Sequence, residues 1–235
     1  MQRADRPIAG RDDRAEVVHD VGRRLARSRH RDTEARREQL DLISAYFVPT
    51  EAGVEAFTAQ ARRGVAVNIL TNALEATDVA VVHAGYAKRR KALLEGGVSL
   101  YELRRQPDTV EPADERLRSI LSGGSSGSSL HAKTFSVDGE RVFVGSFNFD
   151  PRSRDLNTEL GFVIDGAPLA QAIRSGVERR MPDNAYQVKL SEDGDLYWEE
   201  RRGGQLVRHD VEPGTSIWLR AGVWLMSLLP IEWLL

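Results

Sequence analysis

Residues 131–148 read HAKTFSVDGERVFVGSFN and carry the spacing H-x-K-x4-D-x6-G-S-x-N. Residues 131–137 alternate as a β-strand does, Asp138-Gly139 is a favoured pair for a tight turn, and residues 142–146 are typical of a return strand. We therefore predict a β-hairpin. Because side chains two residues apart on a strand share a face, it places His131 and Lys133 together, roughly 7 Å apart along the chain.

An imidazole and an ammonium group on one face suit phosphodiester chemistry. Histidine can attack phosphorus or protonate a leaving oxygen near neutral pH, since its unperturbed pKa is about 6.5. Lys133 would supply positive charge, while Ser146 and Asn148 would donate hydrogen bonds to the oxygens on which negative charge accumulates. The alternative is a surface hairpin with an incidental histidine. The six residues of the motif, all at the stated spacing, argue against it.

The motif resembles that of the phospholipase D superfamily. The resemblance implies a mechanism through a phosphohistidine intermediate, with neither a metal ion nor another cofactor. It also implies a set of catalytic residues within the hairpin, namely His131, Lys133, Asp138, Ser146 and Asn148.

A carboxylate follows the hairpin in DPRSRDLNTELGFVI, residues 150–164, where alternation places Asn157 and Glu159 on one face of a predicted strand. At about the position of Glu159 the superfamily has a carboxylate that holds the histidine ring, like the third member of a hydrolytic triad. The resemblance therefore makes Glu159 a catalytic residue. A solvated strand glutamate is the alternative.

Three further residues are candidate ligands of a phosphate or lipid head group: Arg152, Arg154 and Ser129. Both arginines follow the motif; the alternative interpretation is that they are ordinary surface residues. Ser129 ends the run SGGSSGSS within residues 106–129, which lack periodicity and predict a flexible loop. This loop contains no G-K-[ST] signature, which argues against nucleotide binding.

Composition sets wider limits on the function. With 235 residues, 41% hydrophobic and 29% charged, the chain can bury a sizeable core. Its 33 basic and 35 acidic residues give a net charge of −2, so no global positive field attracts nucleic acid, which is disfavoured as a partner. Cysteine is absent from the sequence, which excludes disulfides and thiolate metal sites.

The fold class is predicted as α/β. Strands and helices alternate: strands are expected at residues 40–49, 65–70 and 98–103, and helices at 51–63 and 78–94. Such alternation implies right-handed crossovers and a mainly parallel sheet with helices outside. The resemblance implies an α-β-α sandwich with a mixed, mainly parallel sheet.

Four segments are expected along the chain. They are a charged segment at 1–38 with a helix at 15–27, the phospholipase D-like domain at 39–182, a small antiparallel β-hairpin appendage at 183–213, and a C-terminal helix at 214–235. The first segment lacks the continuous apolar run of a secretory signal, so no export is indicated.

One stretch narrows the resemblance to a branch of the superfamily. LISAYFVPTEAGVEAF, residues 42–57, is similar to the S-P-Y-F-V-P strand of bacterial cardiolipin synthases, with Ala45 in place of proline. Together with residues 71–103 and 145–164, the similarity extends from about Leu40 to the C-terminus. His83 and Tyr86, one helical turn apart, are interpreted as packing residues rather than phosphate ligands.

The tail SIWLRAGVWLMSLLPIEWLL, residues 216–235, is apolar over about the length of a membrane crossing. Arg220, Pro230 and Glu232 argue against simple insertion, and tryptophans favour the bilayer interface. We predict a helix at the membrane surface, with Trp218, Trp224 and Trp233 at the interface. A helix that docks on the domain's own core is the competing interpretation.

The phospholipase D mechanism uses two histidines, and this chain has one H-x-K motif. In cardiolipin synthases the fold unit occurs twice, and this chain matches the second unit. A homodimer, a separate first-half H-x-K chain, or a non-catalytic lipid-binding remnant would each account for this. The preferred hypothesis is a phosphatidyltransferase of the cardiolipin synthase type.

Its expected partners are a phospholipid, phosphatidylglycerol or phosphatidylethanolamine, and the cytoplasmic face of the inner membrane, where it would be peripheral. Water in place of the lipid acceptor would make the chain a phospholipase D hydrolase, and DNA in place of lipid would make it a dimeric endonuclease. The sequence leaves open the donor lipid, the oligomeric state and which histidine of a pair is the nucleophile.

Overall fold

The computed structural model describes residues 39–77, 79–105 and 130–229. Several sequence predictions fall outside these ranges. They are the helix at 15–27, the loop at 106–129 with Ser129, the capping residue Asp78, and Trp233.

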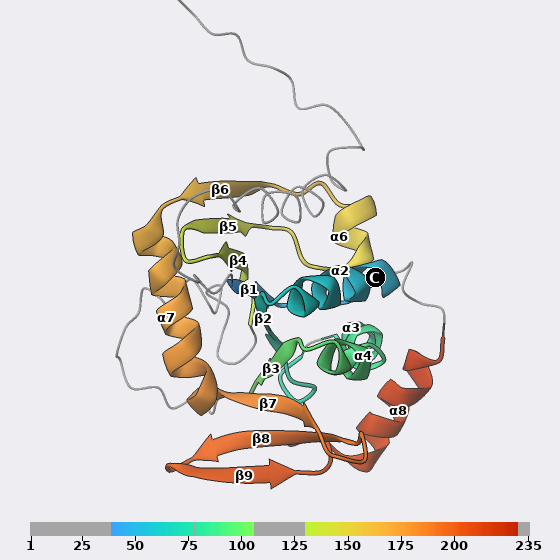
Figure 1. The fold of residues 1–235 in the computed structure, drawn as a ribbon. Helices are drawn as coiled ribbons and strands as arrows, with labels where there is room; N and C mark the ends of the chain where they lie inside the picture. Colours follow the sequence, from blue (N-terminus) through green and yellow to red (C-terminus); the bar gives the residue numbers. More distant parts are fainter. Residues whose placement is uncertain (1–38, 78, 106–129, 230–235) are drawn as a thin grey trace, which may run out of the picture.

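Three parallel strands form the centre of the sheet, as the alternating pattern predicts. They are β1 (Gln39–Ser44), β2 (Ala66–Asn72) and β3 (Ser99–Leu103), in adjacent order (Figure 1). Helix α2 (Glu51–Arg62) connects β1 to β2, and α3 (Ala80–Ala87) and α4 (Arg90–Glu95) connect β2 to β3. The single helix expected at 78–94 is therefore two helices, separated at Lys88-Arg89.

Antiparallel strands extend the sheet on both sides. They are β4 (Lys133–Val137), β5 (Arg141–Gly145) and β6 (Gly161–Asp165) beside β1, and β7 (Ala185–Leu190), β8 (Leu196–Arg202) and β9 (Gln205–His209) beside β3. The strand order is β6-β5-β4-β1-β2-β3-β7-β8-β9.

The prediction of a mainly parallel sheet is wrong. Among the described strands only the β1–β2 and β2–β3 pairs are parallel. Three of the antiparallel pairs, β4–β5, β7–β8 and β8–β9, are hairpins with short connections, which antiparallel pairing allows. The segment expected as a separate appendage belongs to the same sheet, because β7 pairs with β3 from Leu100–Val188 to Leu103–Ala185.

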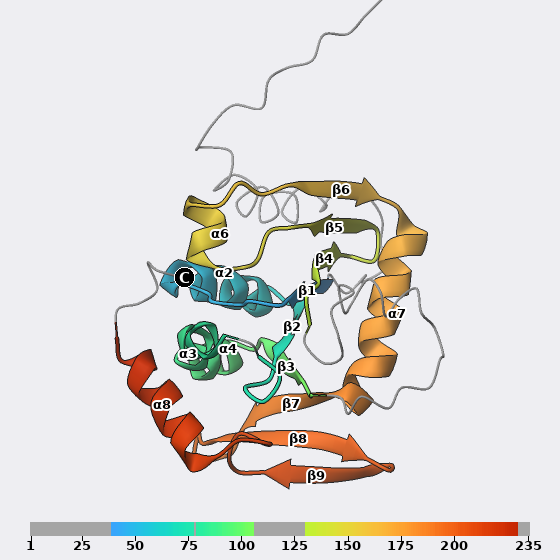
Figure 2. The same cartoon turned by 180° about the vertical axis from the view of Figure 1, so that it is seen from behind.

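Helices cover both faces of this sheet. Alternate residues of β1 and β2 pack against α2, α3 and α4 on one face, and the intervening residues pack against α7 (Ala167–Asn184) on the other. Figure 2 shows the same two layers from behind, with α7 opposite α2, α3 and α4. The observed architecture is thus α/β with helix layers on either side of a mixed sheet.

The start of α2 illustrates how local sequence sets these elements. Thr50 is extended, and its side chain accepts a hydrogen bond from the Gly53 amide, the contact of a helix N-cap, which contributes about 1 kcal/mol. The helix ends before Gly64, whose φ of 90° is a left-handed conformation that glycine adopts without strain.

A buried ion cluster ties the C-terminal segment to the domain. The Arg90 guanidinium donates to Glu102 at 3.1 Å and to Glu212 at 2.5 Å, and His83 Nε2 lies 2.8 Å from Glu212. Burial alone would raise the pKa of Glu212, but the positive charge of Arg90 lowers it to about 2. His83 is therefore a buried packing residue, as interpreted from its helix position.

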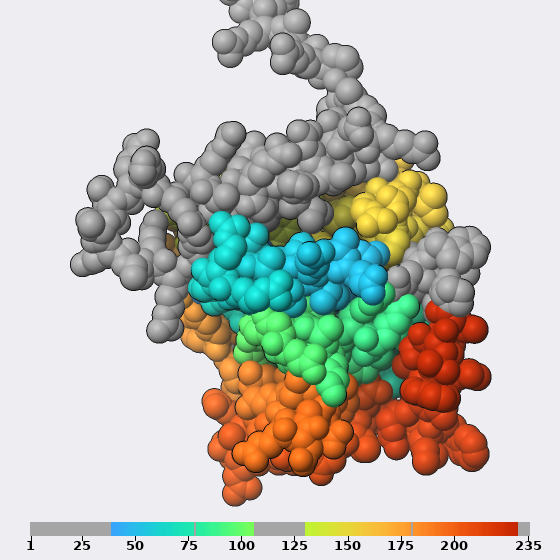
Figure 3. Space-filling view, turned by 45° about the vertical axis from the view of Figure 1, so that its right-hand side comes forward, coloured from blue at the N-terminus to red at the C-terminus, as the bar shows by residue number. Residues whose placement is uncertain are grey.

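The tail forms helix α8 (Ile217–Ser227), which begins at Ser216, whose side chain caps it. Val223 is 3% exposed and packs with Leu74 and Ala84. In Figure 3 α8, drawn in red, lies beside the green segment that contains α3 and α4. One face of the helix thus docks on the domain, whereas Trp218 is 84% exposed.

Candidate active site

Five neighbouring strands bring the motif residues to one edge of the sheet. The carboxyl ends of β1, β2 and β5 lie at this edge together with the starts of β4 and β6, because Ser44 pairs with Lys133 and Gly145 pairs with Gly161. We call it the motif edge. Ligands of open α/β sheets bind outside the carboxyl ends of parallel strands, so its position suits a site.

Lys133 is the first residue of β4, and His131 lies two residues before it. The His131 side chain is exposed, and the Lys133 ammonium donates a hydrogen bond to the His131 carbonyl at 3.1 Å. The imidazole is thus accessible to a ligand, and a positive charge is held close to its backbone.

Gly145 permits the close approach of β6 to the end of β5. A Cβ atom at this position would lie 2.5 Å from the Leu160 carbonyl oxygen and 2.8 Å from the Cα of Gly161, so any larger residue would force the strands apart. At this spacing the Ser146 amide donates to Leu160 O at 2.8 Å, and the Leu160 amide donates to Ser146 Oγ at 3.0 Å. The glycine of the motif is therefore what lets Ser146 reach β6.

Ser146 links the hairpin to Glu159. The serine hydroxyl donates to the Glu159 carboxylate, and Asn157 Nδ2 donates to the same carboxylate at 3.3 Å. Among the described residues, none of the hydrogen bonds of Glu159 reaches the His131 ring. The structure thus brings Glu159 to the motif edge, and its expected role in holding that ring stays a prediction.

Phe149, the residue after Asn148, is hydrogen-bonded to β1 and to the segment that follows it. The Phe149 amide donates to Ser44 Oγ at 3.1 Å, and the Val48 amide donates to the Phe149 carbonyl at 2.8 Å. Within the part of the chain that the structure describes, the Oδ1 atom of Asn148 is buried without a hydrogen-bond partner. Leaving a buried acceptor unsatisfied costs about 1–3 kcal/mol, so the position of this oxygen is unfavourable for stability.

Asp138 lies away from the other motif residues. It occupies the turn between β4 and β5, at the opposite end of β4 from His131, with φ of 56°, and the following Gly139 has φ of 64°. Its Oδ1 accepts from the Gln39 amide at 2.9 Å, and its own amide donates to the Gln39 carbonyl at 2.9 Å. The hairpin turn is as predicted, and the contacts of Asp138 fix that turn to the start of β1.

The two candidate phosphate-binding arginines lie in α6 (Pro151–Asp155), close to the motif edge. Arg154 is held by Asp155, to which its guanidinium donates at 2.9 and 2.7 Å. Arg152 donates to Asn157 Oδ1 at 3.4 Å. Arg152 therefore joins the chain of contacts that leads through Asn157 to Glu159.

Two supporting residues were missed by sequence reasoning. Asp150 caps α6, since its side chain accepts from the Ser153 amide at 2.6 Å, and burial raises its pKa above the ordinary value. Asp150-Pro151 is a recognisable N-cap signature that could have revealed it. Ser44 carries no such signal, because its partner Phe149 lies 105 residues away.

Comparisons with known proteins agree with the motif. Residues 33–181 match the family model described as "Cardiolipin synthase, PLD-like domain". The chain is 52% identical over 198 residues to cardiolipin synthase C of Escherichia coli K12, covering 84% of this chain and 41% of that protein.

A second relative, cardiolipin synthase B of Salmonella typhi, is 30% identical over 159 residues, covering 68% of this chain and 32% of that protein. Among solved structures, the phospholipase D family member Nuc from Salmonella typhimurium aligns with a TM-score of 0.48 and 20% identity, covering 65% of this chain and 83% of that one. The chain spans less than half the length of these two cardiolipin synthases. From the family match over residues 33–181, the chain belongs to the cardiolipin synthase branch of the phospholipase D-like proteins.

Proposed function

We propose that the chain supplies one half of a phosphatidyltransferase of the cardiolipin synthase type. The observation that carries this proposal is the motif edge itself: an exposed imidazole at His131, an ammonium from Lys133 and the Ser146–Glu159 pair gather at one end of the sheet. A second H-x-K unit, from a homodimer or a separate first-half chain, would complete the site.

The proposed reaction is a double displacement at phosphorus. An imidazole nitrogen attacks the phosphodiester of a phospholipid, a P–N bond forms, and the P–O bond to the head group breaks while the second histidine protonates the departing oxygen. The hydroxyl of phosphatidylglycerol then gives its proton to that second histidine and attacks phosphorus. The P–N bond breaks, and cardiolipin and the free imidazole result. In a complex with a first-half chain, we assign His131 the acid–base role by its position in the second unit.

The polar groups around His131 have defined parts in this scheme. Lys133 stabilises the negative charge that gathers on the phosphoryl oxygens. The side-chain NH2 of Asn148, at the same edge, would donate hydrogen bonds to these oxygens. Ser146 positions Glu159, whose carboxylate would favour a charged imidazolium as the proton moves.

Two other functions use the same residues. Water as the acceptor would give phospholipase D hydrolysis, and DNA as the substrate would give a dimeric endonuclease. The net charge of −2 argues against the latter, because non-specific DNA binding rests on clustered positive charge. A lipid-binding remnant would retain the fold without turnover.

The assay that tests the proposal measures cardiolipin formed on phosphatidylglycerol vesicles, with plasmid DNA as a parallel substrate, in the presence of EDTA. We expect transfer to be unchanged by the chelator, because the scheme is carried by histidine and because the described residues hold no group of three or more His, Asp or Glu that could bind a metal. Loss of activity in EDTA and its recovery with a divalent ion would contradict the phosphohistidine scheme. Cleavage of the plasmid without lipid turnover would favour the endonuclease.

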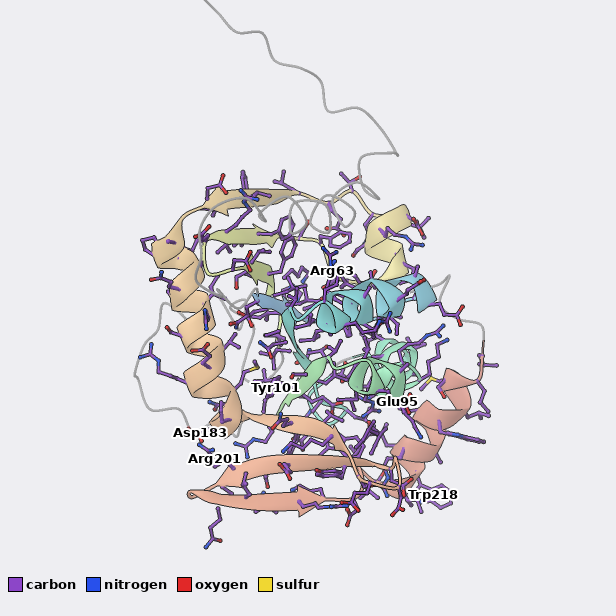
Figure 4. The ribbon with its side chains drawn as sticks, in the orientation of Figure 1. Arg63, Glu95, Tyr101, Asp183, Arg201 and Trp218 are labelled. Atoms are coloured by element: carbon purple, nitrogen blue, oxygen red, sulfur yellow. The ribbon has the colours of Figure 1, made fainter. Side chains whose placement is uncertain are left out.

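We further propose that α8 holds the protein at the membrane surface, on the cytoplasmic face of the inner membrane. The residues that carry this are large apolar side chains exposed on α8, including Trp218, Trp224 and Leu225, at 84%, 64% and 60%. Figure 4 labels Trp218 on the outer side of the domain, away from the packed interior. In the described ranges no helix is both long and apolar enough to cross a bilayer.

Replacing Trp218 and Trp224 with serine tests this membrane contact. Because both side chains are exposed, we expect an unchanged thermal unfolding temperature but a roughly tenfold weaker association with phosphatidylglycerol liposomes, about 1.4 kcal/mol. The matched control is Leu206→Ser, which removes a side chain 69% exposed on β9. Equal sedimentation of the double variant and the control would contradict the membrane role.

A further inference from the structure

Asn72, the last residue of β2, is a buried amide at the motif edge. Its side chain faces the residue that precedes His131, and it is only 2% exposed. Its Oδ1 accepts a hydrogen bond from the Leu130 amide at 2.8 Å, while its Nδ2 donates to the Leu130 carbonyl at 3.2 Å. One side chain therefore binds both backbone polar groups of Leu130.

The same amide reaches the end of β1. Nδ2 of Asn72 also lies 3.3 Å from the Ala45 carbonyl, and the Ala45 amide donates to the Ala132 carbonyl at 3.1 Å. His131 is thus flanked by two backbone anchors, Leu130 on Asn72 and Ala132 on Ala45. Leu130 and Ala132 are buried, at 2% and 6%, while the side chain between them is exposed.

We propose that Asn72 is a positioning residue that fixes the backbone of His131 for catalysis. The proposal rests on the proposed function, because it concerns the same histidine. Asn72 would not contact the substrate. It would act on the imidazole through the backbone of Leu130.

An amide is suited to this position because it both donates and accepts. The Leu130 backbone presents one donor and one acceptor, and a carboxylate of similar reach could accept from the amide but has no hydrogen to donate to the carbonyl. His131 lies two residues before the first strand residue, Lys133, so sheet pairing alone does not fix its carbonyl and amide. Misplacing a catalytic group by about 1 Å can cost roughly a hundredfold in rate.

The test compares Asn72→Ala with Asn68→Ala in the full chain, supplied with its second unit if turnover needs one. Asn68 is a matched control, since it lies on the same strand, four residues before Asn72 and farther from the motif edge, and donates to the buried Asp41 at 2.8 Å. For folded Asn72→Ala we expect kcat to fall about 10- to 100-fold with KM within about threefold. Asn68→Ala should keep the wild-type kcat.

Circular dichroism at the assay temperature establishes that each variant is folded. If Asn72→Ala does not fold, Asn72→Ser carries the test, because its hydroxyl retains one polar partner. A wild-type kcat in the folded Asn72 variant, or an equal loss in Asn68→Ala, would overturn the proposal.

A second measurement works without turnover and so separates this proposal from the proposed function. The ring proton resonances of His131, assigned by their loss in His131→Ala, should shift in Asn72→Ala and stay in place in Asn68→Ala. If the wild-type chain turns over no lipid and these shifts appear, the proposed function fails while Asn72 still positions His131. If the ring resonances are unchanged in Asn72→Ala, the positioning role is wrong.

Discussion

Replacing His131 with alanine is expected to abolish phosphatidyl transfer. In either histidine role the imidazole is irreplaceable: as a nucleophile it forms the P–N bond, and as an acid–base it moves the proton that the leaving oxygen needs. The side chain is exposed, so its removal should leave the unfolding temperature within about 1–2 °C of the wild type. The measurement is product formation per folded protein on lipid vesicles.

A companion variant, Glu159→Gln, measures how much the carboxylate contributes to turnover. The amide keeps the shape but loses the negative charge, so turnover should fall by roughly two to four orders of magnitude, the scale of an acid–base contribution. Glu178→Gln is the matched control, because Glu178 pairs with Arg174 on α7 at 2.8 Å. Undiminished turnover in Glu159→Gln would show that Glu159 does not act in catalysis. Turnover near the wild-type level in His131→Ala would show that the motif is not the catalytic site.

The hairpin at the centre of the site was predictable because its signals are local. Asp138-Gly139 requires two positive φ values, and the structure has both. The strands on either side alternate, and the predicted turn falls between Val137 and Arg141. The parallel core was predictable for the same reason, since each strand and helix of it carries its own periodic pattern.

The pairing of these elements was not predictable from local signals. The sequence of a strand such as β7 has the same pattern whether it belongs to an appendage or pairs with β3. Nothing in it identifies the partner residues, which lie 82 to 88 residues earlier. The contacts of Arg90 were likewise not predictable. Its buried guanidinium pairs with Glu102 and with Glu212, the latter 122 residues away, and no local pattern indicates either partner.

For the candidate site too, local features were predictable and long-range contacts were not. The predicted hairpin implies that its two open ends lie together, and the structure pairs Lys133 with Ser44 and Gly145 with Gly161 at the motif edge. The catalytic roles of the motif residues stay predictions. The resemblance groups Asp138 with these residues, although the hairpin places it in the turn at the other end of β4, because a motif gives spacing along the chain and not distance in space. Nor could it supply Ser44 or Asn72, whose polar partners lie 105 and 58 residues away.

In the mechanism that we propose, the second histidine comes from another polypeptide or from a second copy of this chain. A twofold dimer would place identical motif edges against each other and complete the site from equal halves. Alternatively, more than half of Escherichia coli cardiolipin synthase C lies outside its match to this chain, which is enough length for another unit of this size. Both arrangements predict that an isolated monomer is inactive.

We therefore expect transfer to depend on assembly, and the decisive experiment measures the solution mass of the purified chain together with its activity on phosphatidylglycerol vesicles. If the chain is a dimer, it should be active alone, and mixing wild type with His131→Ala should lower the activity below that of the wild-type fraction.

If the chain is a monomer, adding a chain that carries the first H-x-K unit of a cardiolipin synthase should raise transfer by about a thousandfold or more, because the added chain supplies the missing nucleophile or acid. The control is the same mixture with His131→Ala, which should stay inactive. A monomer that stays inactive with every such partner would contradict the enzyme proposal and leave a lipid-binding role.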